Sequence, residues 1–188
     1  QHFNIYQIHN RSHCQQVELL RSIPEQFRMI DIHLKLESPQ IPLNYWAQCR
    51  RSQELRIDAP YSKIAASYKN GLRYAIRKAK KHGLECEINL CISDFEKFAL
   101  FSKLYRQQAH YKTNHQKLVE LARAAKINQS GSCMGVRNRD GQLITIALIL
   151  WDDKKIYTTF LCNNCLGRKL CGSHFLIDTV IRSFNRRF

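Results

Sequence analysis

Five cations on one predicted helix have the type and spacing needed to bind a polyanion. They are Arg73, Arg77, Lys78, Lys80 and Lys81, and they lie in a stretch, 62–83, that contains no Asp or Glu. The apolar residues of this stretch follow the i, i+3, i+4, i+7 pattern of one helix face: Leu72, Ala75, Ile76 and Ala79. The cations therefore face solvent together, with no acidic neighbour on the helix. Such a stripe predicts a phosphate-rich ligand, which the cations would position.

A solvated surface at a domain junction is the alternative interpretation of these cations, and the sequence leaves both open. Local signals predict where the helix begins and ends. The side-chain oxygen of Asn70 can cap its first turn, and Gly83 can supply the left-handed residue that ends it. A shorter helix is expected before the turn at 69–71.

Cysteine and histidine residues form a second group with possible chemistry near the end of the chain. The group comprises Cys162, Cys165, Cys171 and His174. Thiolates and an imidazole suit zinc, but their spacing matches no common zinc finger, and cysteines at a strand end and in a loop are the simpler interpretation. We therefore predict no metal site.

No nucleophile or acid–base pair is evident from spacing. His110, Tyr111 and His115 lie close together where a substrate could approach, and Tyr157 lies on a predicted strand. Such residues often only cover a core. The catalytic residues are therefore unknown from the sequence.

The elements that would position these groups follow from hydrophobic periodicity. Strict alternation over 27–37 predicts a strand, and two further strands are expected at 45–50 and 54–58, after a short helix at 15–22. Beyond Gly83, alternation predicts another strand, then a helix capped by Ser93 with Glu96, and a second helix over 116–126. The first of these helices would bury Phe95, Phe98, Phe101 or Ser102, and Tyr105, and the second Leu118, Leu121, Ala122 and Ala125.

The strongest strand signals lie between residues 133 and 163. Asn138-Arg139-Asp140-Gly141 predicts a hairpin turn, and the run from Leu143 to Trp151 has the composition of a central strand covered on both faces. A strand over 156–162 and a helix from about Lys169 complete the order.

Composition limits the class of protein. The chain has 188 residues, 44% apolar and 24% charged, which is ordinary for a globular protein, but its net charge of +15 predicts attraction to polyanions. Its eight cysteines, in a chain of this length, favour reduced structural thiols and a cytoplasmic location over a disulfide scaffold. No apolar run approaches the ~20 residues that span a bilayer. The missing initial Met and the end at 184–188 suggest a fragment.

The order of elements from Gly83 resembles the first two thirds of a GNAT acyltransferase domain. Ile76-Arg77-Lys78-Ala79, followed by Gly83-Leu84 and a strand, resembles the domain junction of Fem-type peptidyltransferases and the FemAB-like or BioF2-like GNAT family. The resemblance implies an α/β GNAT (acyl-CoA N-acyltransferase-like) fold, with a mixed, mostly antiparallel sheet flanked by helices and incomplete at the C-terminus. It implies the tail of a first unit at 1–59, basic connecting helices at 60–83, and a second unit at 84–188 that lacks its last strands.

The resemblance also implies a cofactor loop. The family motif is Gln or Arg, two residues, Gly, one residue, then Gly or Ala; its nearest match begins at Lys169 and has His174 in the last place. The residues that would bind the cofactor are Arg168, Lys169, Leu170, Cys171, Gly172 and Ser173. Gly172 and Ser173 would present N–H groups at a helix N-terminus, where a pyrophosphate binds well.

The expected function is therefore transfer of an acyl or aminoacyl group to an amine. The donor would be acetyl-CoA or another acyl-CoA, with aminoacyl-tRNA as the alternative, and the acceptor an amine-bearing small molecule or peptide. A non-catalytic nucleic-acid-binding module that uses the basic helix is the competing hypothesis, although the stretch lacks paired stacking aromatics.

Overall fold

The computed structural model describes residues 2–8, 29–34, 55–105, 114–153 and 155–185. The chain divides into two compact units, Gln1–Gln53 and Glu54–Phe188, which are considered separately below. In the first unit, strand β1 (His2–Ile8) pairs in parallel with β2 (Met29–Leu34). The strand expected from alternation over 27–37 is thus confirmed, whereas the helix at 15–22 and the strand at 45–50 lie outside the described residues.

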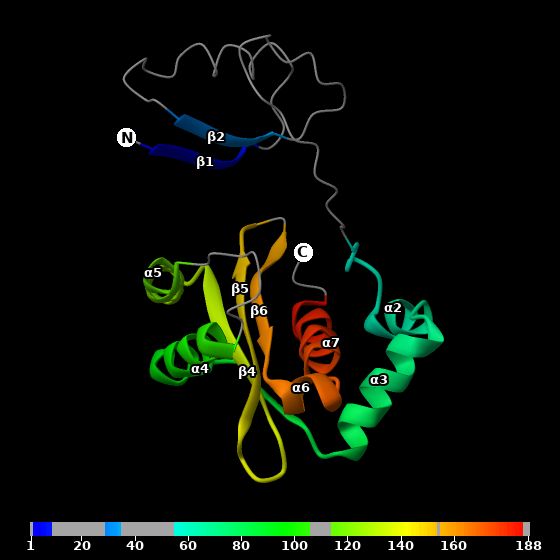
Figure 1. The fold of residues 1–188 in the computed structure, drawn as a ribbon. Helices are drawn as coiled ribbons and strands as arrows, with labels where there is room; N and C mark the ends of the chain where they lie inside the picture. The colour runs from blue at the N-terminus through cyan, green and yellow to red at the C-terminus, as the bar shows by residue number, and fades with distance from the viewer. Residues whose placement is uncertain (1, 9–28, 35–54, 106–113, 154, 186–188) are drawn as a thin grey trace. The chain divides into compact units, whose positions relative to one another are not determined.

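The second unit contains a four-stranded antiparallel sheet in the order β3-β4-β5-β6 (Figure 1). Its strands are β3 (Glu85–Glu87), β4 (Gly131–Arg137), β5 (Leu143–Trp151) and β6 (Ile156–Asn163). The predicted bounds of β5 are confirmed. So is the hairpin turn before it, where Gly141 has a φ of 76° and the Asn138 side chain accepts the N–H groups of Asp140 and Gln142.

Helices cover both faces of this sheet (Figure 1). Helices α4 (Ile92–Tyr105) and α5 (His115–Ile127) lie on one face, and α6 (Cys165–Lys169) and α7 (Gly172–Phe184) on the other. Helices α2 (Tyr61–Ala66) and α3 (Asn70–Lys81) belong to this unit, and α3 packs beside α7. An α/β architecture with an antiparallel sheet flanked by helices is therefore present.

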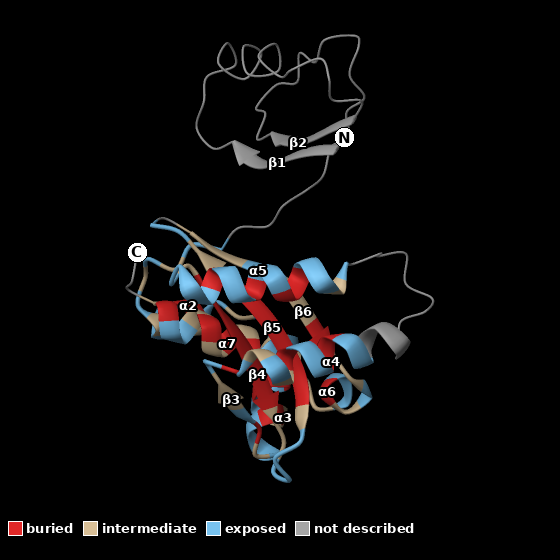
Figure 2. Cartoon of the chain, turned by 90° about the vertical axis from the view of Figure 1, so that its left-hand side faces the viewer, coloured by how far each residue is buried: buried red, intermediate tan, exposed pale blue. Residues whose placement is uncertain are grey.

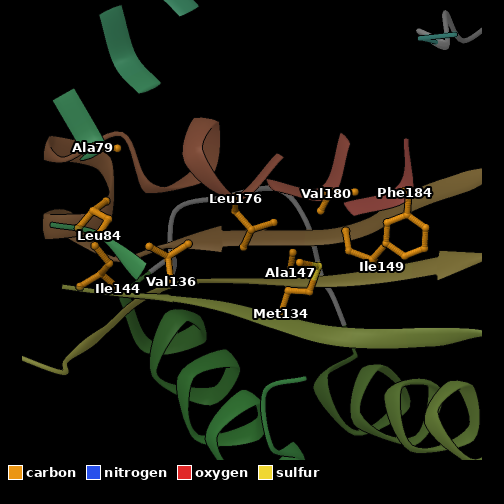
Figure 3. Packing of buried hydrophobic residues seen from close by; sticks show 10 residues of the cluster. All are labelled: Ala79, Leu84, Met134, Val136, Ile144, Ala147, Ile149, Leu176, Val180 and Phe184. Atoms are coloured by element: carbon orange, nitrogen blue, oxygen red, sulfur yellow. The ribbon is translucent and has the colours of Figure 1, made fainter. Parts of the chain in front are cut away.

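Two apolar clusters hold these layers together, one on each face of the sheet. On one face, Leu176, Val180 and Phe184 of α7 point towards Met134, Ala147 and Ile149 of the sheet (Figure 3). On the other, Phe95, Phe98 and Ala99 of α4 and Leu118 and Ala122 of α5 pack over Ile146 and Leu148. Burial is concentrated in β4 and β5, as expected for strands covered on both sides (Figure 2).

Several local predictions are wrong, and tertiary contacts explain part of the difference. Residues 55–58 form no strand; the Ile57 carbonyl instead accepts a hydrogen bond from the Asn185 side chain. Helix α4 begins at Ile92, so Ser93 lies inside the helix, and Glu96 pairs with Arg123. Lys69, not Asn70, occupies the N-cap of α3.

Most of the predicted buried faces of α4 and α5 are confirmed, because Phe95, Phe98, Leu118, Ala122 and Ala125 are buried. Leu121, also expected in the core, retains 39% of its accessible surface, and Phe101, expected there as an alternative to Ser102, retains 47%. Ala99 and Val119 are buried in addition. The side chains of Ser102 and Tyr105 lie outside the described residues. None of the described helices is long and apolar enough to cross a membrane.

Candidate functional site

The basic helix α3 has the two faces that its sequence predicts. Ala75, Ile76 and Ala79 are buried and Leu72 is half-buried, whereas Arg73, Arg77, Lys80 and Lys81 are exposed and Lys78 is partly so. The helix ends where Gly83 takes a φ of 64°. Within the described residues, no carboxylate forms an ion pair with any of the five cations. The stripe therefore retains its full positive charge.

Arg73 differs from the other cations of the stripe because it also has a structural contact. Its guanidinium donates a hydrogen bond to the Ala66 carbonyl at the end of α2. Arg73 thereby joins α2 to α3 across the intervening turn. Arg77 is the better residue for testing ligand binding, since its substitution leaves this contact intact.

The predicted cofactor loop contains a short helix that we did not expect. Arg168 and Lys169 lie in the last turn of α6, so they do not form an extended loop before α7. Asn164 starts this helix, because its Oδ1 accepts the N–H of Gly167 at 2.8 Å. Arg168 and Lys169 remain exposed, whereas Leu170 and Cys171 are half-buried.

Gly172 and Ser173 open α7, as the sequence predicts. Cys171 is the N-cap residue, with a left-handed φ of 62°, and its side chain makes no capping hydrogen bond. Gly172 also meets a packing requirement, because a Cβ at this position would lie 2.1 Å from Thr145 Oγ1 on β5. The glycine that suits a phosphate-binding turn is thus needed for helix–sheet contact.

The structure brings part of the basic stripe and part of the α7 N-terminus to two adjoining pockets. The arginine pocket, about 500 Å³, is lined by Tyr61, Ala65, Tyr68, Asn70, Arg73, Ile76 and Arg77. The apolar pocket, about 220 Å³, is lined by Tyr68, Leu72, Ile76, Leu161, Ser173, His174, Ile177, Asp178 and Ile181. Tyr68 and Ile76 belong to both. Lys78, Lys80, Lys81, Arg168 and Lys169 line neither pocket.

A buried carboxylate lies beside these pockets, and sequence reasoning missed it. Asp178 of α7 is only 2% exposed. Its Oδ1 accepts a hydrogen bond from the Tyr61 hydroxyl at 2.8 Å, and its Oδ2 forms an ion pair with Arg182 at 3.0 Å. The Arg182 guanidinium also lies over the Tyr61 ring, 4.9 Å from the centroid. One charged residue in the apolar run 175–181, four residues before an arginine, was the available signal.

The Asp178 network joins the start of α2 to the end of α7. The Asn185 side chain extends it, accepting the Tyr61 N–H and donating to the carbonyls of Ile57 and Ala59. Burial and hydrogen bonding to Asp178 raise the pKa of Tyr61, whereas its bond to Arg182 opposes the rise. The network therefore sets the position of α2 and α3, and with them the basic stripe, against α7.

The cysteine and histidine group does not gather into a metal site. Cys162 packs in the cluster beneath α4 and α5, on the sheet face opposite α7, whereas Cys165 and His174 are exposed. Among the residues that the structure describes, no three potential ligands lie close enough to hold a metal ion. The six described cysteines are free thiols.

Stability at high pH should depend on two of these thiols. Burial raises the pKa of Cys86 and of Cys133 from 9.0 to about 11. Between these values the folded state keeps a proton that the unfolded state loses, so the free energy of unfolding should fall as pH rises from 9 to 11. The expected loss is roughly 2 kcal/mol per thiol. Urea denaturation of wild type and of a Cys86→Ala/Cys133→Ala variant should show a smaller loss in the variant.

The exposed Cys165 is the matched control for this measurement. Cys165→Ala removes a thiol at an exposed position outside both apolar clusters, so it controls for the loss of a thiol as such. If the free energy of unfolding fell equally steeply with pH in wild type and in the double variant, the raised pKa values of Cys86 and Cys133 would be contradicted.

The other candidate residues are not brought together by the described structure. His110 and Tyr111 lie outside the described residues, and His115 is the first residue of α5. The Tyr157 hydroxyl donates to Asp152 at 2.9 Å on the exposed side of β6. Comparisons with protein-family models, with curated proteins and with solved structures returned no match.

Proposed function

We propose that the chain is an acyl- or aminoacyltransferase of the GNAT class, related to FemAB-like proteins. The observation that carries the proposal is the arrangement of the second unit. An antiparallel sheet has two helices between its first and second strands, and these helices cover one face. The helix that follows the last strand covers the other face. This is the order expected for the first two thirds of a GNAT domain.

The donor is proposed to be acetyl-CoA or another acyl-CoA, with aminoacyl-tRNA as the alternative, and the acceptor an amine. The N-terminus of α7 supports a donor phosphate, because its uncapped first turn carries the positive end of the helix dipole. Arg73 and Arg77 add charge at the neighbouring pocket. Transfer of this kind depends mainly on holding the amine against the ester or thioester, so it requires no catalytic triad.

Calorimetric titration of the 188-residue chain with acetyl-CoA, and separately with transfer RNA, tests the proposal. Saturable binding of acetyl-CoA at one site per chain is the expected result. Binding of aminoacyl-tRNA in preference to uncharged tRNA would support the alternative donor. Equal retention of any RNA, without binding of acetyl-CoA, would instead support the nucleic-acid-binding module and overturn the proposal.

Charge reversal on α3 should weaken donor binding. An Arg77→Glu/Lys81→Glu variant changes the local charge by four units, so we expect affinity for the donor to fall about 10-fold at low salt. The salt dependence of binding should also become flatter. Calorimetry at two salt concentrations measures both effects, and unchanged donor affinity would exclude the stripe from the donor site. Arg77→Glu alone should cause most of the loss, because Arg77 lines a pocket and Lys81 does not.

A further inference from the structure

The arginine pocket and the apolar pocket have complementary chemistry and share a boundary. The apolar pocket has five aliphatic side chains in its wall, including Leu72, Leu161 and Ile177. The arginine pocket has two guanidinium groups, those of Arg73 and Arg77, and no Asp or Glu in its lining. A ligand that fills both therefore needs an apolar part and an anionic part.

Tyr68 stands at the boundary with an unsatisfied polar group. Its hydroxyl oxygen is buried and has no partner at hydrogen-bonding geometry within the described part of the chain, although the Asp178 carboxylate lies near enough to interact with it. Leaving such a group unpaired is costly, so its position between the pockets points to a ligand acceptor. Burial, and then the nearby Asp178 carboxylate, raise the pKa of Tyr68, which keeps its phenol protonated as a donor.

The negative charge of Asp178 does not oppose an anion here. Asp178 lines the apolar pocket, but its two oxygens are already engaged by Tyr61 and Arg182. Tyr68 and His174 are the other ionisable side chains in that lining, and Arg73 and Arg77, which form no ion pair among the described residues, line the adjoining pocket. The balance of charge around the two pockets is thus positive, and it complements an anionic head group.

We propose that the two pockets form one binding site for an amphipathic anion, a short aliphatic chain that ends in a carboxylate or a phosphate. The chain lies in the apolar pocket between α3 and α7. The head group lies in the arginine pocket with Arg77 and Arg73, and Tyr68 donates a hydrogen bond to an oxygen of the ligand where the pockets meet. The site borders the proposed donor site, because Ser173 and His174 of the first turn of α7 line the apolar pocket and Arg77 is expected to serve both. It does not depend on the proposed acyl transfer.

Titration of the 188-residue chain with octanoate and with octyl phosphate tests the site, and the two probes separate carboxylate from phosphate ligands. We expect saturable binding of at least one probe at one site per chain. Butanoate and inorganic phosphate should bind at least about 10-fold more weakly, because neither fills the apolar pocket. Equal affinity for inorganic phosphate and octyl phosphate would overturn the proposal, as would binding that does not saturate.

Single substitutions in and outside the pockets test where the ligand binds. Arg77→Gln should weaken binding about 10-fold and Tyr68→Phe about fivefold, the latter corresponding to one hydrogen bond. Lys81→Gln removes the same charge from the same helix outside both pockets, and it should change affinity less than twofold. If Arg77→Gln and Lys81→Gln lowered the affinity equally, binding would depend only on the charge of α3 and not on the pocket, which would contradict the proposal.

Filling the apolar pocket provides a second, independent variant. Leu72 is half-buried, so Leu72→Trp can extend into the pocket and should abolish octanoate binding. An unchanged melting temperature would confirm that the variant folds, and undiminished binding in it would overturn the proposal. The two proposals remain separable, because octanoate titration of Leu72→Trp tests the apolar pocket, whereas acetyl-CoA titration of the wild-type chain tests the donor site whatever the octanoate result.

Discussion

Gly167→Ala should destabilise the second unit by about 3 kcal/mol or more, which is the high end for overpacking a rigid site. Gly167 is buried where α6 crosses β5, and a Cβ there would lie 2.2 Å from the Ile144 carbonyl oxygen. That oxygen belongs to the backbone of a central strand and already accepts the Asn164 N–H at 3.1 Å. Neither backbone can move away without breaking the pairing of β5 with the end of β6 or the cap of α6. Urea denaturation followed by circular dichroism measures the loss.

Two other glycines provide matched controls. Gly71 lies in α3, where an added Cβ would meet nothing within 4 Å, so Gly71→Ala should be neutral or stabilise by about 0.5–1 kcal/mol. Gly172→Ala meets the Thr145 side chain instead of a backbone atom. Thr145 Oγ1 is the nearest atom to a Cβ at Gly172, at 2.1 Å, but only the second nearest to a Cβ at Gly167, at 2.8 Å after the Ile144 carbonyl oxygen. Adding Thr145→Ala should therefore recover a larger part of the loss in Gly172→Ala than in Gly167→Ala. Gly167→Ala at wild-type stability would contradict the close approach of α6 to β5.

Asp178→Ala should cost about 2–3 kcal/mol, below the roughly 3–5 kcal/mol of a fully buried ion pair because Arg182 remains half-exposed. The substitution leaves the Tyr61 hydroxyl without its acceptor and opens a space between α7 and α2. Asp178→Asn keeps the acceptor for Tyr61 and weakens only the bond to Arg182, so it should cost about 1 kcal/mol. Thermal unfolding of both variants measures the two losses of stability, and Asp178→Ala should show the larger one.

Hydrogen exchange can show where the Asp178→Ala variant loosens. Amides of α3 should lose part of their protection, because the network joins α2 to α7 and the Arg73 hydrogen bond joins α3 to α2, whereas the direct packing of α3 on α7 remains. Amides of α5 on the far face of the sheet serve as the internal control and should keep their relative protection. Uniform loss of protection in both helices would mean that Asp178 stabilises the unit as a whole and does not specifically position the basic stripe.

Local patterns predicted the elements of the second unit well. The run of apolar residues in β5, the Asp-Gly turn before it and the apolar face of α3 all appear where periodicity placed them. These signals depend on neighbours three or four positions away, or on a single turn, so they can be recognised along the chain. Helix starts were less accurate at Asn70 and Ser93, since capping preferences compete with nearby alternatives.

The pairing of distant residues could not be predicted in this way. Tyr61 and Asp178 are 117 positions apart, and neither has a sequence pattern that identifies the other. The same holds for Tyr68 and the apolar pocket, and for the contact between Thr145 and Gly172. A glycine that suits a phosphate-binding turn is indistinguishable, from the sequence, from a glycine that lets a helix approach a strand.

Composition and short-range periodicity specify the positive charge of α3, its apolar face and the order of strands and helices, so these can be read along the chain. Which of the cations border a pocket depends on how the helices pack. The arginine pocket lies between α2 and α3, so Arg73 and Arg77 line it and Lys80 and Lys81 do not. A buried carboxylate on α7, Asp178, binds Tyr61 at the start of α2. The physical reason is that burial and electrostatic pairing depend on distances in space between elements far apart in the chain.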